Sequence, residues 1–140
     1  MTSLGTARET IYETFAAAWG TTTPIAFDNE AFNPPTDGSS WVRVVVRHDS
    51  SNLEAIGGRG FGGMNLYQRT GRLVVQVFVR ENKGTEEADS LAQAARAIFE
   101  GTTLSSNAIR FNNGIVREVG QDSPWFQVNL EVAFQYDERK

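Results

Sequence analysis

The chain has 140 residues, of which 40% are hydrophobic and 21% are charged. This length and composition are typical of one globular domain, which we expect to span residues 1–140, and they exclude a disordered or fibrous chain. The absence of cysteine excludes disulfides and thiolate metal sites, and a formal net charge of -4 makes nucleic acid an unlikely partner.

The sequence contains no pattern that is typical of a signal peptide or a membrane-spanning helix. Residues 1–4 contain no basic region followed by an apolar stretch, and no segment approaches the roughly 18 consecutive apolar residues that cross a bilayer. We therefore expect a protein that is neither exported by a signal peptide nor embedded in a membrane.

The first predicted element is an amphipathic helix over residues 6–19. Its apolar residues recur at the spacing of one helical face, namely Ala7, Ile11, Phe15 and Ala18 with Trp19. Thr6 followed by Glu9 matches a capping box, and Gly20 is placed to end the helix.

A proline-containing loop over residues 21–40 follows, within which residues 25–27 could pair at a sheet edge. Residues 41–48 alternate as a half-buried strand, which the polar run 49–52 is expected to end. The glycine-dense segment 53–71 has little to bury, so we expect it to be mobile unless a partner orders it.

The second half is predicted to consist of a strand, a helix and further strands. Residues 72–80 are apolar on both faces, which predicts a central strand covered on both sides. A second helix opens at Gly84 and Thr85, with acidic residues in its first turn, and ends at Gly101.

The last predicted strands flank an Asn-Asn-Gly sequence. Residues 108–111 and 115–119 form either a hairpin around this turn or one bulged strand. Residues 126–136 alternate as a long amphipathic strand, and residues 137–140 are expected to fray. The fold class that follows is α+β, a mainly antiparallel β-sheet with two α-helices packed on one face.

Two glycine motifs lack the context that their chemistry requires. Gly58, Gly60 and Gly63 match the dinucleotide fingerprint, but no helical pattern follows and no parallel βαβ unit surrounds them. The same run begins like an RNA-recognition motif, yet Gly63 and Leu66 stand where base-stacking aromatics are needed. The sequence predicts no nucleotide, no cofactor and no RNA site here.

His48 is the only histidine, so a metal cluster of several histidines is excluded and a catalytic triad would need its base at this position. No nucleophile motif or supporting carboxylate accompanies it, and we interpret His48 as a surface or rim residue. Acidic pairs at positions 86–87 and 137–138 are interpreted as helix-cap and tail charges. The sequence therefore predicts no catalytic residues and no metal site.

The glycine-dense segment holds the candidate protein interface: Gly58, Arg59, Gly60 and Phe61. Arginine and aromatic residues are enriched at binding hot spots, and this segment is too rich in glycine to fold by itself. We expect residues 57–64 to become ordered when the protein assembles.

Three stretches together carry a resemblance to a known family. They are RTGRLVVQVFVR at residues 69–80, GTEEADSLAQAARAIFEG at residues 84–101 and WFQVNLEVAFQYD at residues 125–137. With the opening helix, this pattern resembles the phage tail terminator, or tail completion, proteins. The resemblance implies a non-catalytic minor tail protein of a phage or prophage virion, assembled in the bacterial cytoplasm.

The resemblance also implies partners. Such proteins form a ring, usually of six subunits, that caps the tail tube and joins tail to head, so this chain would bind itself, a tail tube protein and a head-tail connector protein. Two alternatives stay open: another head-tail connector component, or a small nucleic-acid or ligand-binding module that uses Arg43, Arg47, Arg59 and Arg72.

Overall fold

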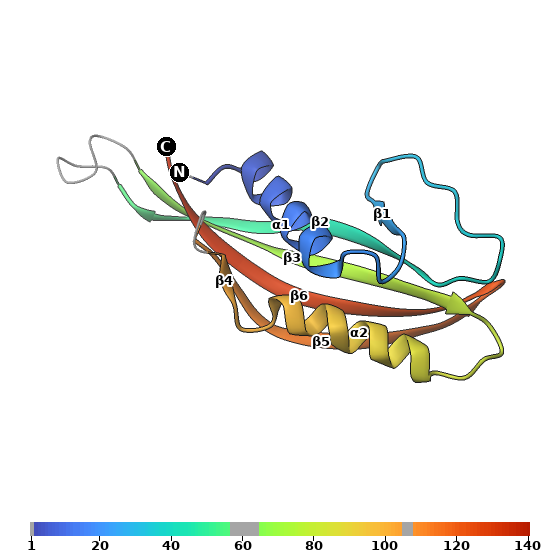
Figure 1. Cartoon of the computed structure of the whole chain (residues 1–140). Helices are drawn as coiled ribbons and strands as arrows, with labels where there is room; N and C mark the ends of the chain where they lie inside the picture. Colours follow the sequence, from blue (N-terminus) through green and yellow to red (C-terminus); the bar gives the residue numbers. More distant parts are fainter. Residues whose placement is uncertain (1, 57–64, 105–107) are drawn as a thin grey trace.

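The chain forms a six-stranded sheet and two helices in the computed structural model, which describes residues 2–56, 65–104 and 108–140 (Figure 1). The elements in chain order are α1 (Leu4–Trp19), β1 (Ile25–Phe27), β2 (Trp41–Ala55), β3 (Leu66–Arg80), α2 (Glu86–Phe99), β4 (Thr103–Leu104), β5 (Ile109–Asp122) and β6 (Trp125–Arg139). The strands lie in the order β1-β2-β3-β6-β5-β4. An α+β fold is confirmed, but the sheet is mixed, since β1 pairs with β2 in parallel while the other pairings are antiparallel.

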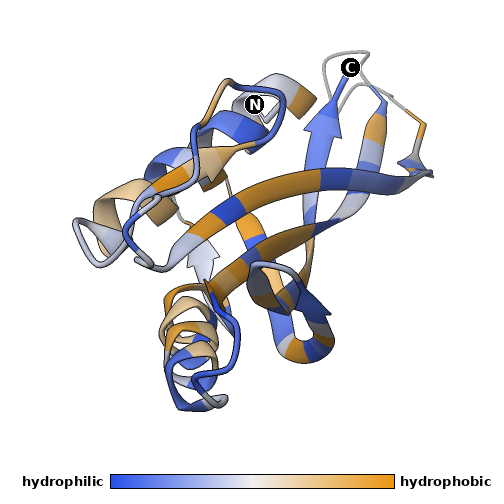
Figure 2. Cartoon of the chain, turned by 90° about the vertical axis from the view of Figure 1, so that its right-hand side faces the viewer, coloured by the Kyte–Doolittle hydropathy of each residue, from blue (hydrophilic) through white to orange (hydrophobic). Residues whose placement is uncertain are grey.

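Both helices cover the same face of the sheet, as predicted (Figure 2). We call this the inner face and the opposite one the outer face. The helices bury one stripe each: Ala7, Ile11, Phe15 and Trp19 from α1, and Ala88, Ala92, Ala95 and Phe99 from α2. Ala18, which was expected on the buried stripe, is exposed. The alanines of α2 let the helix backbone approach the valines and leucines of β3 and β6 closely.

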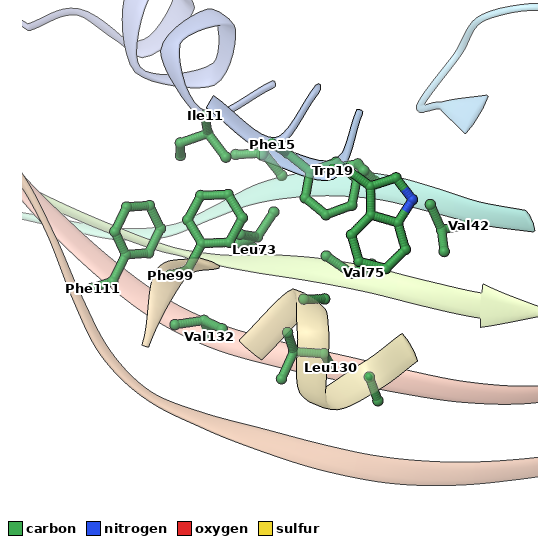
Figure 3. Close-up of a cluster of buried hydrophobic side chains, with 14 of the residues drawn as sticks. Ile11, Phe15, Trp19, Val42, Leu73, Val75, Phe99, Phe111, Leu130 and Val132 are labelled. Atoms are coloured by element: carbon green, nitrogen blue, oxygen red, sulfur yellow. The ribbon is translucent and has the colours of Figure 1, made fainter. Parts of the chain in front are cut away.

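A run of aromatic rings crosses this core (Figure 3). The ring of Phe15 lies 5.0 Å from that of Trp19 and 6.2 Å from that of Phe99, which joins the two helices. From Phe99 the run continues through Phe111 on β5 to Phe134 on β6, with centroid distances of 5.0 and 5.9 Å. Each such side chain contributes about 1.5–3 kcal/mol through burial alone.

Among the described residues, those of the loop before β2 cover one end of the outer face. There Trp41 stacks on Phe78 at 4.1 Å, and Phe32, from the loop before β2, stacks on Trp41 at 5.0 Å. The prediction that residues 72–80 are covered on both sides is therefore right for Phe78 and wrong for Arg72, whose side chain is 52% exposed. Over the rest of that face most side chains are polar, although Val45, Val74 and Ile115 also lie on it.

Helix α1 begins earlier than predicted. Its N-cap is Ser3, whose hydroxyl oxygen accepts a hydrogen bond of 3.2 Å from the Thr6 backbone N–H. The capping box at Thr6 and Glu9 is therefore wrong, because Thr6 lies inside the helix and the capping hydroxyl is that of Ser3, one turn earlier. The end of the helix at Gly20, where φ is +59°, is confirmed.

Strands β2 and β3 extend well past their predicted ends. The polar run 49–52 does not end β2, since residues 50–53 pair with residues 67–70 of β3 after a bulge at His48/Ser50. The described parts of the glycine-dense segment, residues 53–55 and 66–71, are likewise in strands. Polar side chains suffice here because this part of the sheet reaches beyond the helices and faces water. We call residues 50–55 with residues 66–70 the arm.

The C-terminal strands also settle two expectations. β5 is one continuous strand with bulges at Phe111/Gly114 and Glu118/Gly120, so the bulged-strand alternative holds and the hairpin is wrong. Residues 137–139 do not fray, because they pair with residues 66–68 of the arm, and Lys140 exchanges two backbone hydrogen bonds with Asn65.

Candidate interaction surfaces

The predicted interface residues Gly58, Arg59, Gly60 and Phe61 lie outside the described residues. Their role as an interface stays a prediction. The described part of the chain offers other surfaces, which are built by the two lateral strands of the sheet and by the base of the arm.

The first surface is the lateral edge of β2. Strand β1 pairs only with residues 42–44, and Arg8 of α1 donates a hydrogen bond of 3.1 Å to the Val46 carbonyl. Beyond these contacts, residues 47–55 have no neighbouring strand among the described residues on the side that points away from β3. A strand edge of this kind presents backbone groups that can pair with another chain.

The second surface is the lateral edge of β5. Strand β4 pairs only with Ile109 and Arg110, and the Gly114 N–H donates to a carboxylate oxygen of Glu100 at 2.6 Å. In the described part of the chain, no strand lies beside residues 114–122 on this side. The sheet thus has two open lateral edges, one at each side.

Apolar side chains are exposed at both edges. At the arm and the start of α1, Leu53 and Leu4 are each 50% exposed and Ile56 is 78% exposed. On β5, Ile115 and Val119 are 46% and 55% exposed. Large apolar residues gathered on open strand edges are typical of association surfaces.

A pocket of about 580 Å³ lies between the start of α1 and the base of the arm. Leu4, Ser51 and Arg69 are among its lining residues, together with His48 and Tyr136. The Arg69 side chain is held in place, because its Nε and a terminal nitrogen donate to one Glu138 oxygen at 3.0 and 2.9 Å. The pocket therefore has a fixed polar wall on β3 and β6 and a more apolar wall at Leu4.

His48 lies at this pocket, half-buried on the inner face, and not simply at a strand end. Its Nε2 is 2.8 Å from the Tyr136 hydroxyl, while its Nδ1 is buried and has no hydrogen-bond partner. Burial, followed by the charge of Arg8, lowers the pKa of His48 below its ordinary value of 6.5, so the ring is neutral at pH 7.

The groups around His48 are not arranged for nucleophilic catalysis. The two carboxylates at the pocket are occupied, Glu138 by Arg69 and Asp49 by Arg72 at 3.2 Å. Ser51 accepts a hydrogen bond from Arg69 and does not contact the imidazole. Within residues 2–56, 65–104 and 108–140, His48 has neither a nucleophile nor an orienting carboxylate in hydrogen-bond contact, as a catalytic base would require.

Among the described residues, no group of three or more histidine, cysteine or acidic side chains could hold a metal ion. Neither of the helices in that part of the chain combines the length and apolarity of a membrane-crossing helix.

Three arginines of the nucleic-acid alternative, Arg43, Arg47 and Arg72, do share the outer face, on β2 and β3. Arg47 forms an ion pair with Asp28 at 2.6 Å, and Arg72 contacts Asp49 and Glu131. Arg43 packs over the Trp41 ring. Much of the positive charge on this face is therefore already neutralised.

The sequence predicted free strand edges for protein contacts but did not indicate which strands form them. One signal could have revealed the β5 edge. Ile115 and Val119 are apolar residues among polar neighbours, as expected for side chains that another protein covers. The β2 edge gave no such signal, because residues 49–52 are all polar.

Comparisons with known proteins agree with this fold. A search of curated proteins found no match. A solved structure covers 92% of this chain and 94% of its own, with a TM-score of 0.64 and 17% sequence identity, which indicates a shared fold. A family model described as Phage tail terminator protein matches residues 6–134, from α1 to β6 and so nearly the whole length. The chain therefore belongs to the phage tail terminator family and is a structural protein of a phage tail.

Proposed function

We propose that the protein forms a ring, of six subunits, that caps the finished tail tube and joins the tail to the head without catalysing a reaction. The observation that carries this proposal is the family match over residues 6–134. Its partners would be further copies of itself, the tail tube protein and a head-tail connector protein, and assembly would take place in the host cytoplasm.

The surfaces of the chain support such a role. A head-to-tail ring needs two different patches on each subunit, and open strand edges with exposed apolar residues are suited to this. Such edges are present at opposite sides of the sheet. The predicted ordering of residues 57–64 on assembly belongs to the same proposal and would be tested by amide hydrogen exchange before and after assembly.

Electron microscopy of tail tubes tests the proposal. Tubes polymerised from the tube protein alone should have two bare ends, and tubes mixed with this protein should carry a ring-shaped cap at one end and then attach to purified heads. Tubes whose ends stay bare at saturating protein, and that do not join heads, would refute the capping role.

A further inference from the structure

The two open edges lie at opposite sides of the sheet, so they can meet only between different copies. Following the pairings, β2 is antiparallel to β3, β3 to β6 and β6 to β5, which makes β5 antiparallel to β2. If two copies stand side by side in the same orientation, the β5 edge of one therefore faces the β2 edge of the next in an antiparallel sense. Antiparallel pairing between edges extends a sheet from one chain to another.

The regular parts of the two edges are similar in length. On β2, residues 50–53 pair without interruption between the bulges at His48/Ser50 and Leu53/Ala55. On β5, residues 114–118 run between the bulges at Phe111/Gly114 and Glu118/Gly120. Because a bulge disrupts the hydrogen-bond ladder, we expect regular pairing over residues 50–53 of β2 and residues 114–118 of β5.

The backbone groups of β5 are oriented for pairing with a strand on the side away from β6. The Gly114 N–H points away from β6 and already donates to the Glu100 carboxylate, so a partner strand would pair beyond this N–H. The two-residue period of a strand gives Val116 and Glu118 the same outward orientation of their backbone groups. Exposed apolar side chains lie on both regular stretches, Leu53 on β2 and Ile115 on β5.

We propose that residues 114–118 of one copy pair in an antiparallel sense with residues 50–53 of the next copy, so that copies associate head to tail. Leu53 lies on the inner face and Ile115 on the outer face, so each loses exposed area to the neighbouring copy on its own side of the joined sheet. The inference rests on the proposed function, because it names the surfaces through which the ring subunits would touch.

Two single variants and their mixture test this arrangement. Leu53→Asp places a charge on the β2 edge and Ile115→Asp places one on the β5 edge, while Ala133→Asp is a matched control, since Ala133 is also exposed but lies on the outer face of the central strand β6. Each edge variant should lower the self-association constant at least about tenfold, as expected for a residue central to an interface. The control should associate like the unmodified chain.

The mixture distinguishes a head-to-tail contact from a symmetric one. Leu53→Asp retains an intact β5 edge and Ile115→Asp retains an intact β2 edge, so an equimolar mixture can form one good contact and should stop at heterodimers. Analytical ultracentrifugation at about 100 µM would measure this, and thermal melts would establish that each variant is folded.

Several results would overturn the proposal. They are an unmodified chain that stays monomeric at millimolar concentration, an edge variant that is folded and still assembles like the unmodified chain, or a mixture of folded variants with no heterodimer. The capping assay is independent of these measurements. Bare tubes together with heterodimers of the two variants would refute the proposed function and support the edge contact. Capped tubes without heterodimers would refute the edge contact and support the proposed function.

Discussion

Gly71 on β3 occupies a position where the backbone of β2 and an aromatic ring come too close for any side chain. A Cβ atom there would lie 2.4 Å from the Arg47 carbonyl oxygen and 2.6 Å from Cζ of Phe134. Gly5 is the opposite case, since a Cβ on this residue of α1 would meet nothing within 4 Å. The same chemical change should therefore have opposite effects at the two positions.

We predict that Gly71→Ala lowers the free energy of unfolding by about 1–3 kcal/mol, because Phe134 or β2 has to move. Gly5→Ala should raise it by about 0.5–1 kcal/mol through the better helix propensity of alanine. Urea denaturation followed by tryptophan fluorescence measures both values. An unchanged free energy of unfolding for Gly71→Ala would contradict the prediction.

His48 should make the stability of the protein depend on pH. Since the folded state holds the pKa of His48 below 6.5, the unfolded chain binds a proton there more readily as the pH falls below that value. The contribution present above pH 6.5 is then lost as the pH drops through the folded pKa. The physical reason is that a protonated Nδ1 would be a buried donor with no acceptor, close to Arg8 and Arg69 and only partly offset by Asp49.

We predict that the unmodified chain loses more stability between pH 7.5 and pH 5 than His48→Gln does. Glutamine retains a group that can hydrogen-bond the Tyr136 hydroxyl but does not titrate. Carboxylates titrate in both proteins, so the difference between the two pH profiles isolates the histidine. Parallel profiles would contradict the prediction.

The start of α1 is one element at which the structure differs from the sequence-based prediction. We predict that Ser3→Ala lowers the free energy of unfolding by about 1 kcal/mol, because the Thr6 N–H loses the acceptor that caps the helix. Thr6→Ala should cost less, since the Thr6 hydroxyl only accepts an exposed hydrogen bond from Ser3. Equilibrium unfolding of both variants measures this, and a larger loss for Thr6→Ala would restore the capping box at Thr6.

The elements that were predicted correctly are those with a period. The stripes of α1 and α2, the alternation around Val75 and the alternation around Leu130 place these segments without knowledge of the fold, because each must bury one side. Gly20 and Gly101, with φ of +59° and +70°, end the helices where a left-handed or similar conformation is required.

The arm could not be predicted, because it has no period to detect. Ser50 to Leu53 are mostly polar and resemble a turn, yet they remain a strand through their pairing with β3 and through contacts such as the short hydrogen bond from Arg69 to Ser51. The C-terminal residues 137–139 are ordered for the same reason, since the arm supplies their pairing partner. The edges of the sheet, and hence the candidate site, depend on this pairing between distant segments.

At the scale of the whole molecule, the distribution of charge argues against the alternative function, binding to nucleic acid. The arginines that this alternative needs, Arg47 and Arg72, hold Asp28, Asp49 and Glu131, so phosphates would have to displace carboxylates. We predict that binding to duplex or single-stranded DNA at about 150 mM salt is no stronger for the unmodified chain than for Arg47→Ala. Fluorescence anisotropy measures this. Micromolar binding with a steep salt dependence, weakened by the substitution, would favour the alternative.

The aromatic run from Trp19 to Phe134 has a consequence for how the molecule opens. Phe15 of one helix rests on Phe99 of the other, and Phe99 rests on Phe111 of the sheet. If either helix separates from the sheet, aromatic rings that pack against the other helix become exposed to water. Local opening of one helix is therefore coupled to opening of the other. The buried turns of α1 and α2 should therefore exchange their amide hydrogens with one common protection factor, and Phe99→Leu should lower protection in both helices together.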